Sequence, residues 1–213
     1  MTQTLALYAS FPQEEHVTSN RNTIIRSLHD LGAAAWFGGS LMGAVGVNGV
    51  SQDVKDPAER AAIASGGWAR WAPVSAAAIG AHVIGSVGIF LANRDRVRDQ
   101  QGAAANSVIK SVLTVAAIGT TVYSGILGAK IATEGGSAPV EGGTVPSAGT
   151  PDKVAGRQQQ QRILQWVTPV LTGGIVVLGA QQGEQQRASE QIRTRGWSTV
   201  TGALSRVPKL AAS

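Results

Sequence analysis

The chain has no cysteine, and acidic and basic side chains are missing from four long stretches. Without cysteine, a disulfide framework, thiol catalysis and a cysteine-ligated metal site are excluded. The uncharged stretches are Leu31 to Gln52, Trp71 to Asn93, Ser111 to Ala129 and Ile163 to Gly183. A helix rises about 1.5 Å per residue and a bilayer core is about 30 Å thick, so each stretch is long enough to span it. The sequence therefore predicts an all-α polytopic membrane protein with four transmembrane helices in a bundle.

Motifs for common enzyme chemistry are also missing. The chain has no paired carboxylates, no Ser-His-Asp order, no HExxH sequence, no phosphate-binding loop and no dinucleotide-binding fingerprint. The net charge of +5 does not indicate nucleic-acid binding, because the cations gather beside the ends of the apolar stretches. Membrane proteins carry such cations in their cytoplasmic loops for topological reasons. The prediction leans away from an enzyme and excludes a nucleic-acid partner.

Composition divides the chain into a membrane domain over residues 22–186 and two cytoplasmic tails. A capping-box-like start at Asp56-Pro57-Ala58-Glu59 predicts a short extramembrane helix to about Ser65, ending at Gly66-Gly67. Gly, Ser, Pro and Thr dominate residues 134–156, which we expect to be a flexible linker without a core-forming pattern. The expected segments are a tail over 1–21, spans over about 31–50, 71–93, 111–129 and 163–180, and a basic tail over 187–213.

Cations outside the spans predict the sidedness of the chain. Ten lie in the two tails and the second connection, against six in the first and third connections. By the positive-inside rule, both termini are expected in the cytoplasm of a bacterial inner membrane. No basic region precedes the short apolar stretch near the N-terminus, so the first helix is expected to act as the insertion signal.

Small residues at four-residue spacing mark faces where transmembrane helices can pack closely. The first two spans each carry one such face, so we expect these spans to be packing partners. Pro169 lies inside the fourth span and is expected to bend it, because a proline there frees a carbonyl four residues earlier. The predicted packing residues are Ala35, Gly39 and Gly43 in the first span and Ala77, Ala81 and Gly85 in the second.

Of the three histidines, His82 alone is predicted to lie deep within a span. An ionisable side chain at that depth is a functional candidate by default. The alternative is a neutral imidazole that bonds a Ser, a Thr or a carbonyl group on a neighbouring helix. His29 is expected at the cytoplasmic edge of the first span.

The run Leu28-His29-Asp30-Leu31-Gly32-Ala33-Ala34-Ala35-Trp36-Phe37-Gly38-Gly39 resembles the first helix of membrane families related to copper-resistance protein D and membrane haem-type protoporphyrinogen oxidase. That resemblance implies haem b, with His29 as the candidate ligand. Counted from Asn93, His82 is expected roughly 16 Å deeper than His29, which makes the two a poor axial pair. Haem would then need His29 or His82 alone, or a non-histidine partner.

More broadly, the chain resembles uncharacterised actinobacterial four-span proteins through the region from Trp166 to Gln186, a likeness that implies no activity. The leading hypothesis is a non-enzymatic scaffold or accessory subunit of a membrane assembly, without a cofactor or metal. Its partners would be the lipid bilayer and either further copies of the chain or another membrane protein. The alternatives are a small-solute transporter, suggested by Pro169, Gly173 and Gly174 in the fourth span, and a haem b redox protein.

Overall fold

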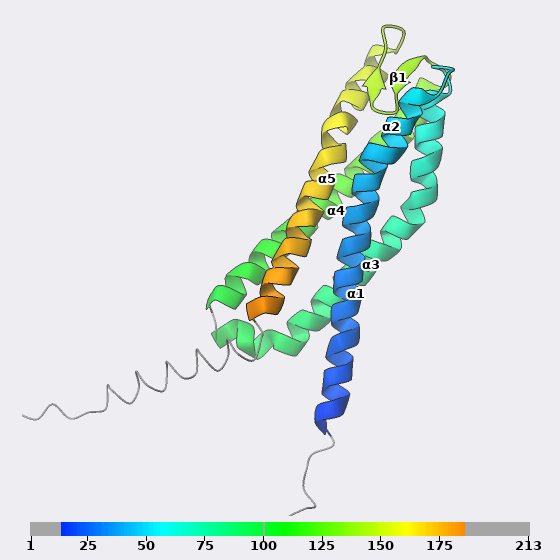
Figure 1. The fold of residues 1–213 in the computed structure, drawn as a ribbon. Coiled ribbons are helices and arrows are strands. Elements are labelled where there is room, and N and C mark those ends of the chain that lie inside the picture. Colours follow the sequence, from blue (N-terminus) through cyan, green and yellow to red (C-terminus); the bar gives the residue numbers. More distant parts are fainter. Residues whose placement is uncertain (1–13, 100, 186–213) are drawn as a thin grey trace, which may run out of the picture. The chain divides into compact units, whose positions relative to one another are not determined.

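The computed structural model describes residues 14–99 and 101–185, which are mostly helical (Figure 1). The chain divides into two compact units, Met1–Val176 and Val177–Ser213, and the packing described below lies within the first. The predicted basic tail over 187–213 lies outside the described residues. The elements in chain order are α1 (Glu14–Met42), the π-helical turn η1 (Gly43–Val47), α2 (Asn48–Val50), the 3-10 turn η2 (Ser51–Asp53), α3 (Arg60–Asp99), α4 (Gln101–Gly135), β1 (Val140–Gly142), β2 (Val145–Pro146) and α5 (Asp152–Gln185).

In the part of the chain that the structure describes, three helices are long and apolar enough to cross a membrane. They cover Arg60–Ala92, Ala105–Gly135 and Asp152–Gln181, and they contain the second, third and fourth predicted spans. The multi-pass membrane character is thus supported. The first predicted span, 31–50, is helical but is divided among α1, η1 and α2, so its crossing of the bilayer stays a prediction.

Two predicted boundaries are wrong. The short separate helix ending at Gly66-Gly67 does not exist, because α3 begins at Arg60 and continues through both glycines. Asp56 still caps this start, since its Oδ1 accepts a hydrogen bond from the Ala58 amide at 2.9 Å. Likewise α1 begins at Glu14, within the predicted loose tail. In both cases the backbone hydrogen bonds of the helix continue through residues that composition marks as breakers or tail.

The first and second predicted spans pack against each other, as expected, and run antiparallel. Along α1 the contacts progress from Ile25 to Val47, while along α3 they progress backwards from Gly88 to Gly67. The buried apolar core is small and draws on α1, α3, α4 and α5. Its members are Ala33, Trp36, Ala78, Ala117 and Ile175.

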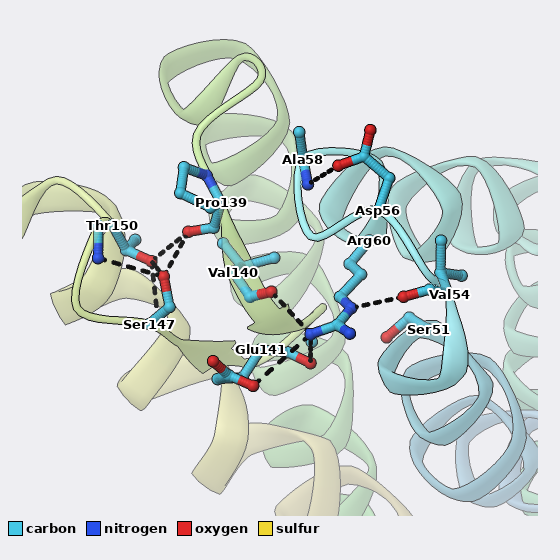
Figure 2. Close-up of polar contacts among 12 residues, drawn as sticks. Ser51, Val54, Asp56, Ala58, Arg60, Pro139, Val140, Glu141, Ser147 and Thr150 are labelled. Carbon is cyan, nitrogen blue, oxygen red and sulfur yellow. Dashed lines mark hydrogen bonds and ion pairs between the residues drawn. The ribbon is translucent and has the colours of Figure 1, made fainter.

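The predicted flexible linker instead contains an antiparallel hairpin, β1 and β2, folded against the start of α3. Val140 is only 1% exposed, and its amide donates to the Pro57 carbonyl oxygen at 3.1 Å. The Arg60 guanidinium donates to the carbonyl oxygens of Val54, Val140 and Glu141 (Figure 2). Composition missed this hairpin because its partners lie on distant parts of the chain.

The hairpin brings the first and third predicted connections together. The Gly143 amide donates to Ser51 Oγ at 2.9 Å, and Ser51 Oγ donates in turn to the Asn48 carbonyl oxygen at 2.7 Å. Both connections therefore lie at one end of the helices, as Figure 1 also shows for β1 and α2. An even number of antiparallel spans requires this arrangement.

Candidate functional site

The two histidines singled out in the sequence lie side by side. Their ring centroids are 4.5 Å apart with the planes tilted by 43°, and His29 and His82 are 3% and 0% exposed. The expected difference in depth is wrong. It was counted from Asn93, but α3 runs on to Asp99 and α1 starts at Glu14, so each histidine lies between four and five helical turns from its helix end.

Two glycines permit this close approach of α1 and α3. A Cβ atom at Gly32 would lie 2.5 Å from the His82 amide nitrogen and 2.6 Å from the Ala78 carbonyl oxygen. A Cβ atom at Gly85 would collide with the backbone of His29. Gly85 belongs to the predicted packing face, whereas sequence reasoning missed Gly32. The spacing of His29, Gly32 and Trp36 on one helical face was the available signal.

Hydrogen bonding fixes the tautomer of His82. A carbonyl oxygen can only accept, so His82 Nδ1 carries a proton and donates to the His29 carbonyl oxygen at 3.2 Å. In a neutral ring Nε2 is then an acceptor, and it receives the Thr114 hydroxyl at 3.2 Å. His82 thereby links α1, α3 and α4. These are the partners that the alternative reading of a neutral, bonded imidazole requires.

His29 makes a different contact, because its Nδ1 donates to Asp30 Oδ1 at 2.7 Å. A carboxylate in this position commonly orients a metal-ligating histidine. Here, however, the His82 ring lies against the His29 ring.

The arrangement does not fit a haem held by this pair. Axial imidazoles on opposite sides of an iron have ring centres roughly 6 Å apart, since each metal–nitrogen bond is about 2 Å long. The observed 4.5 Å leaves no room for a porphyrin between the rings, and both nitrogens of His82 are engaged. Across residues 14–99 and 101–185, no three His, Cys, Asp or Glu side chains come together as a metal site.

Trp36 extends the cluster toward α4, although sequence reasoning did not select it as a site residue. Its side chain is 1% exposed, its Nε1 donates to Thr121 Oγ1 at 3.1 Å, and its ring lies 6.2 Å from that of His82. Polar contacts thus continue from the histidine pair along α4.

The buried face of α5 is polar, a pattern that sequence reasoning also missed. We call this face the polar seam; Gln165 in it is half-buried and the others are buried, at alternating spacings of three and four residues. Large apolar side chains such as Ile163, Trp166 and Val170 point outward instead. A helix that is apolar outside and polar inside suits a lipid surrounding. The polar seam consists of Gln158, Gln161, Gln165, Thr168 and Thr172.

Asn48 joins the polar seam to α3, just after the π-helical turn η1. Its Nδ2 donates to Gln165 Oε1 at 2.8 Å, and its Oδ1 accepts from Trp68 Nε1 at 2.9 Å. π-Helical turns are often found at functional sites. Trp68 therefore faces α1, rather than standing in a lipid-facing aromatic belt.

The other predicted packing residues are divided. Gly39 and Gly43 lie under the indole rings of Trp71 and Trp68, so their lack of a side chain is used. Ala35 and Ala77 are exposed and Ala81 is half-buried. The predicted face is thus rotated from the face that α1 buries. α5 continues as a helix through Pro169, and the predicted bend there stays a prediction.

The fold and this site define a helical protein with membrane-spanning features and an interior of paired polar side chains. No protein-family model, curated protein or solved structure matches the chain.

Proposed function

We propose that this chain is a four-span inner-membrane protein with cytoplasmic termini that acts as a non-enzymatic scaffold or accessory subunit. The observation that carries the proposal is the engagement of His82. This side chain would be the reactive centre of a haem or proton-coupled protein, yet both its nitrogens bond neighbouring helices. The most distinctive buried ionisable group thus holds the helices together.

The outer surface supports a role in association. In α4, large apolar side chains face away from the rest of the chain, where lipid or another membrane protein can cover them. The exposed apolar residues of α4 include Val108, Val112, Val115, Val122 and Ile126.

Site-specific crosslinking in native membranes tests this proposal. A photoreactive amino acid at Val115 should give one discrete product, a homo-oligomer or a single partner present in equal amount after purification in mild detergent. The matched control replaces buried Ala117 in the same helix and should give no intermolecular product. A monodisperse monomer without crosslinks at Val115 would contradict the proposal.

Small-solute transport is the second candidate, and the polar seam of α5 favours it. Polar side chains inside a membrane domain often mark substrate or ion pathways. The seam covers fourteen residues from Gln158, about 21 Å of helix. Solute uptake into proteoliposomes that is lost in Thr172→Val would support transport over the scaffold. A colourless preparation without a Soret band is expected in either case.

A further inference from the structure

Gln158 is a buried side chain whose hydrogen-bonding capacity is only half used. It is 0% exposed, and its Nε2 donates to the carbonyl oxygens of Gly142 at 3.0 Å and Gly143 at 3.4 Å. These two acceptors fix which end of the amide is nitrogen. Its Oε1 is therefore an oxygen, and it has no hydrogen-bond partner among the residues that the structure describes.

Two further buried oxygens share this condition. Gln161 Oε1, one turn along the same face of α5, and Ser124 Oγ on α4 also have no hydrogen-bond partner within the described chain. Contacts on either side bring these turns of α4 and α5 together. Tyr123 donates to Gln160 Oε1 at 2.7 Å, and Thr168 Oγ1 donates to Thr120 Oγ1 at 3.3 Å.

The chemistry of these atoms selects a class of ligand. Two of them are neutral amide oxygens and the third is a hydroxyl, and buried acceptors need a donor or a cation. Calcium and magnesium sites rely on carboxylates. The nearest carboxylate along these turns, Glu134, is paired with the Arg157 guanidinium. We propose that Gln158, Gln161 and Ser124 bind a small monovalent cation, Na⁺ or K⁺, at the hairpin end of the polar seam.

The hairpin is part of this site, because its Gly142 and Gly143 carbonyl groups hold the Gln158 amide in place. Cation binding is thus coupled to docking of the hairpin, and it should stabilise the folded protein. This inference does not depend on a scaffold or a transport function.

Thermal unfolding of the detergent-purified full chain tests the proposal in NaCl, KCl and choline chloride at equal ionic strength. Na⁺ or K⁺ should raise the melting temperature above the choline value in a saturable way, by roughly 5–10 °C at a hundredfold excess over Kd. Gln158→Leu and Ser124→Ala should each abolish this difference. Gln159→Leu, at an exposed neighbouring position, should retain it.

Identical melting curves in the three salts would overturn the proposal and leave only ordered water on these oxygens. So would a cation-dependent increase that survives in both Gln158→Leu and Ser124→Ala. Equilibrium dialysis with radioactive ²²Na⁺ and with ⁸⁶Rb⁺ as a K⁺ analogue provides a second readout if Gln158→Leu does not fold. Wild type should bind one ion per chain, and Ser124→Ala should bind at least tenfold more weakly. Crosslinking at Val115 is unaffected by either result, so the two proposals fail separately.

Discussion

At the scale of single residues, the contact between α1 and α3 depends on glycines that leave no space for a side chain. Gly85→Ala should lower the melting temperature by an amount equivalent to about 1–3 kcal/mol, because the new methyl group overlaps the His29 backbone. Gly80→Ala is the matched control in the same helix, since nothing lies within 4 Å of its Cβ position. It should be neutral or stabilise by up to about 1 kcal/mol. Equal melting temperatures for the two variants would contradict the close approach.

The second prediction at this scale concerns the hydrogen bond between His82 and Thr114. Thr114→Val keeps the shape of the side chain but removes the donor to His82 Nε2. A buried acceptor without its partner costs about 1–3 kcal/mol, although hydrogen bonds between membrane helices average only about 0.6 kcal/mol. We therefore expect a loss of about 1 kcal/mol in a detergent unfolding assay.

Thr133→Val is the control for Thr114→Val. Its hydroxyl is exposed and bonds only carbonyl groups of its own helix, so this substitution should change stability little. If the two valine variants unfold alike, His82 does not rely on Thr114.

At the scale of elements, Arg60 holds the hairpin through three carbonyl oxygens and an ion pair with the Glu141 carboxylate at 3.5 Å (Figure 2). Arg60→Ala should raise the rate of cleavage after exposed Glu141 by a glutamate-specific protease at least about tenfold. One charged hydrogen bond contributes about 1.5 kcal/mol or more to keeping such a segment closed. Mass spectrometry of the fragments measures the rate.

Arg70→Ala is the control for Arg60→Ala, because the Arg70 side chain donates only to the Gly66 carbonyl oxygen of its own helix. An unchanged cleavage rate in Arg60→Ala would mean that other contacts, such as Val140 with Pro57, are sufficient.

Elements also differ in how far the sequence predicts them. The helical character of the four apolar stretches follows from length and missing charge. The hairpin is different, because Val140 and Gly143 find their partners at Pro57 and Ser51, about ninety residues earlier. Local composition contains no information on such pairs. The polar seam of α5 was visible as glutamines at helical spacing, but their number on all sides of the helix concealed which face is buried.

At the scale of the whole molecule, the number of spans determines where the termini lie. The chain has no cysteine, so single cysteines introduced at Thr2, Ala148 and Ser213 can be labelled individually. With four spans, a membrane-impermeant maleimide added to spheroplasts should label Thr2→Cys and Ser213→Cys only after lysis. Ala148→Cys, exposed beside the hairpin, should react in intact spheroplasts.

If α1 does not cross the bilayer, three spans remain and the N-terminus lies on the same side as the hairpin. Labelling of Thr2→Cys together with Ala148→Cys before lysis would therefore reject the four-span arrangement. Labelling after lysis with a permeant maleimide controls for burial of each cysteine.

The sequence by itself determined that several long helices avoid charge, and that the first two predicted spans are packing partners. Those properties are local, because helix length, hydropathy and small-residue spacing lie within one continuous stretch. Only the tertiary structure decided that His29 and His82 meet, that Gly32 is a contact point and that Gln158 faces inward. The rotation and axial register of each helix set these contacts, and both depend on how side chains of separate helices fit together.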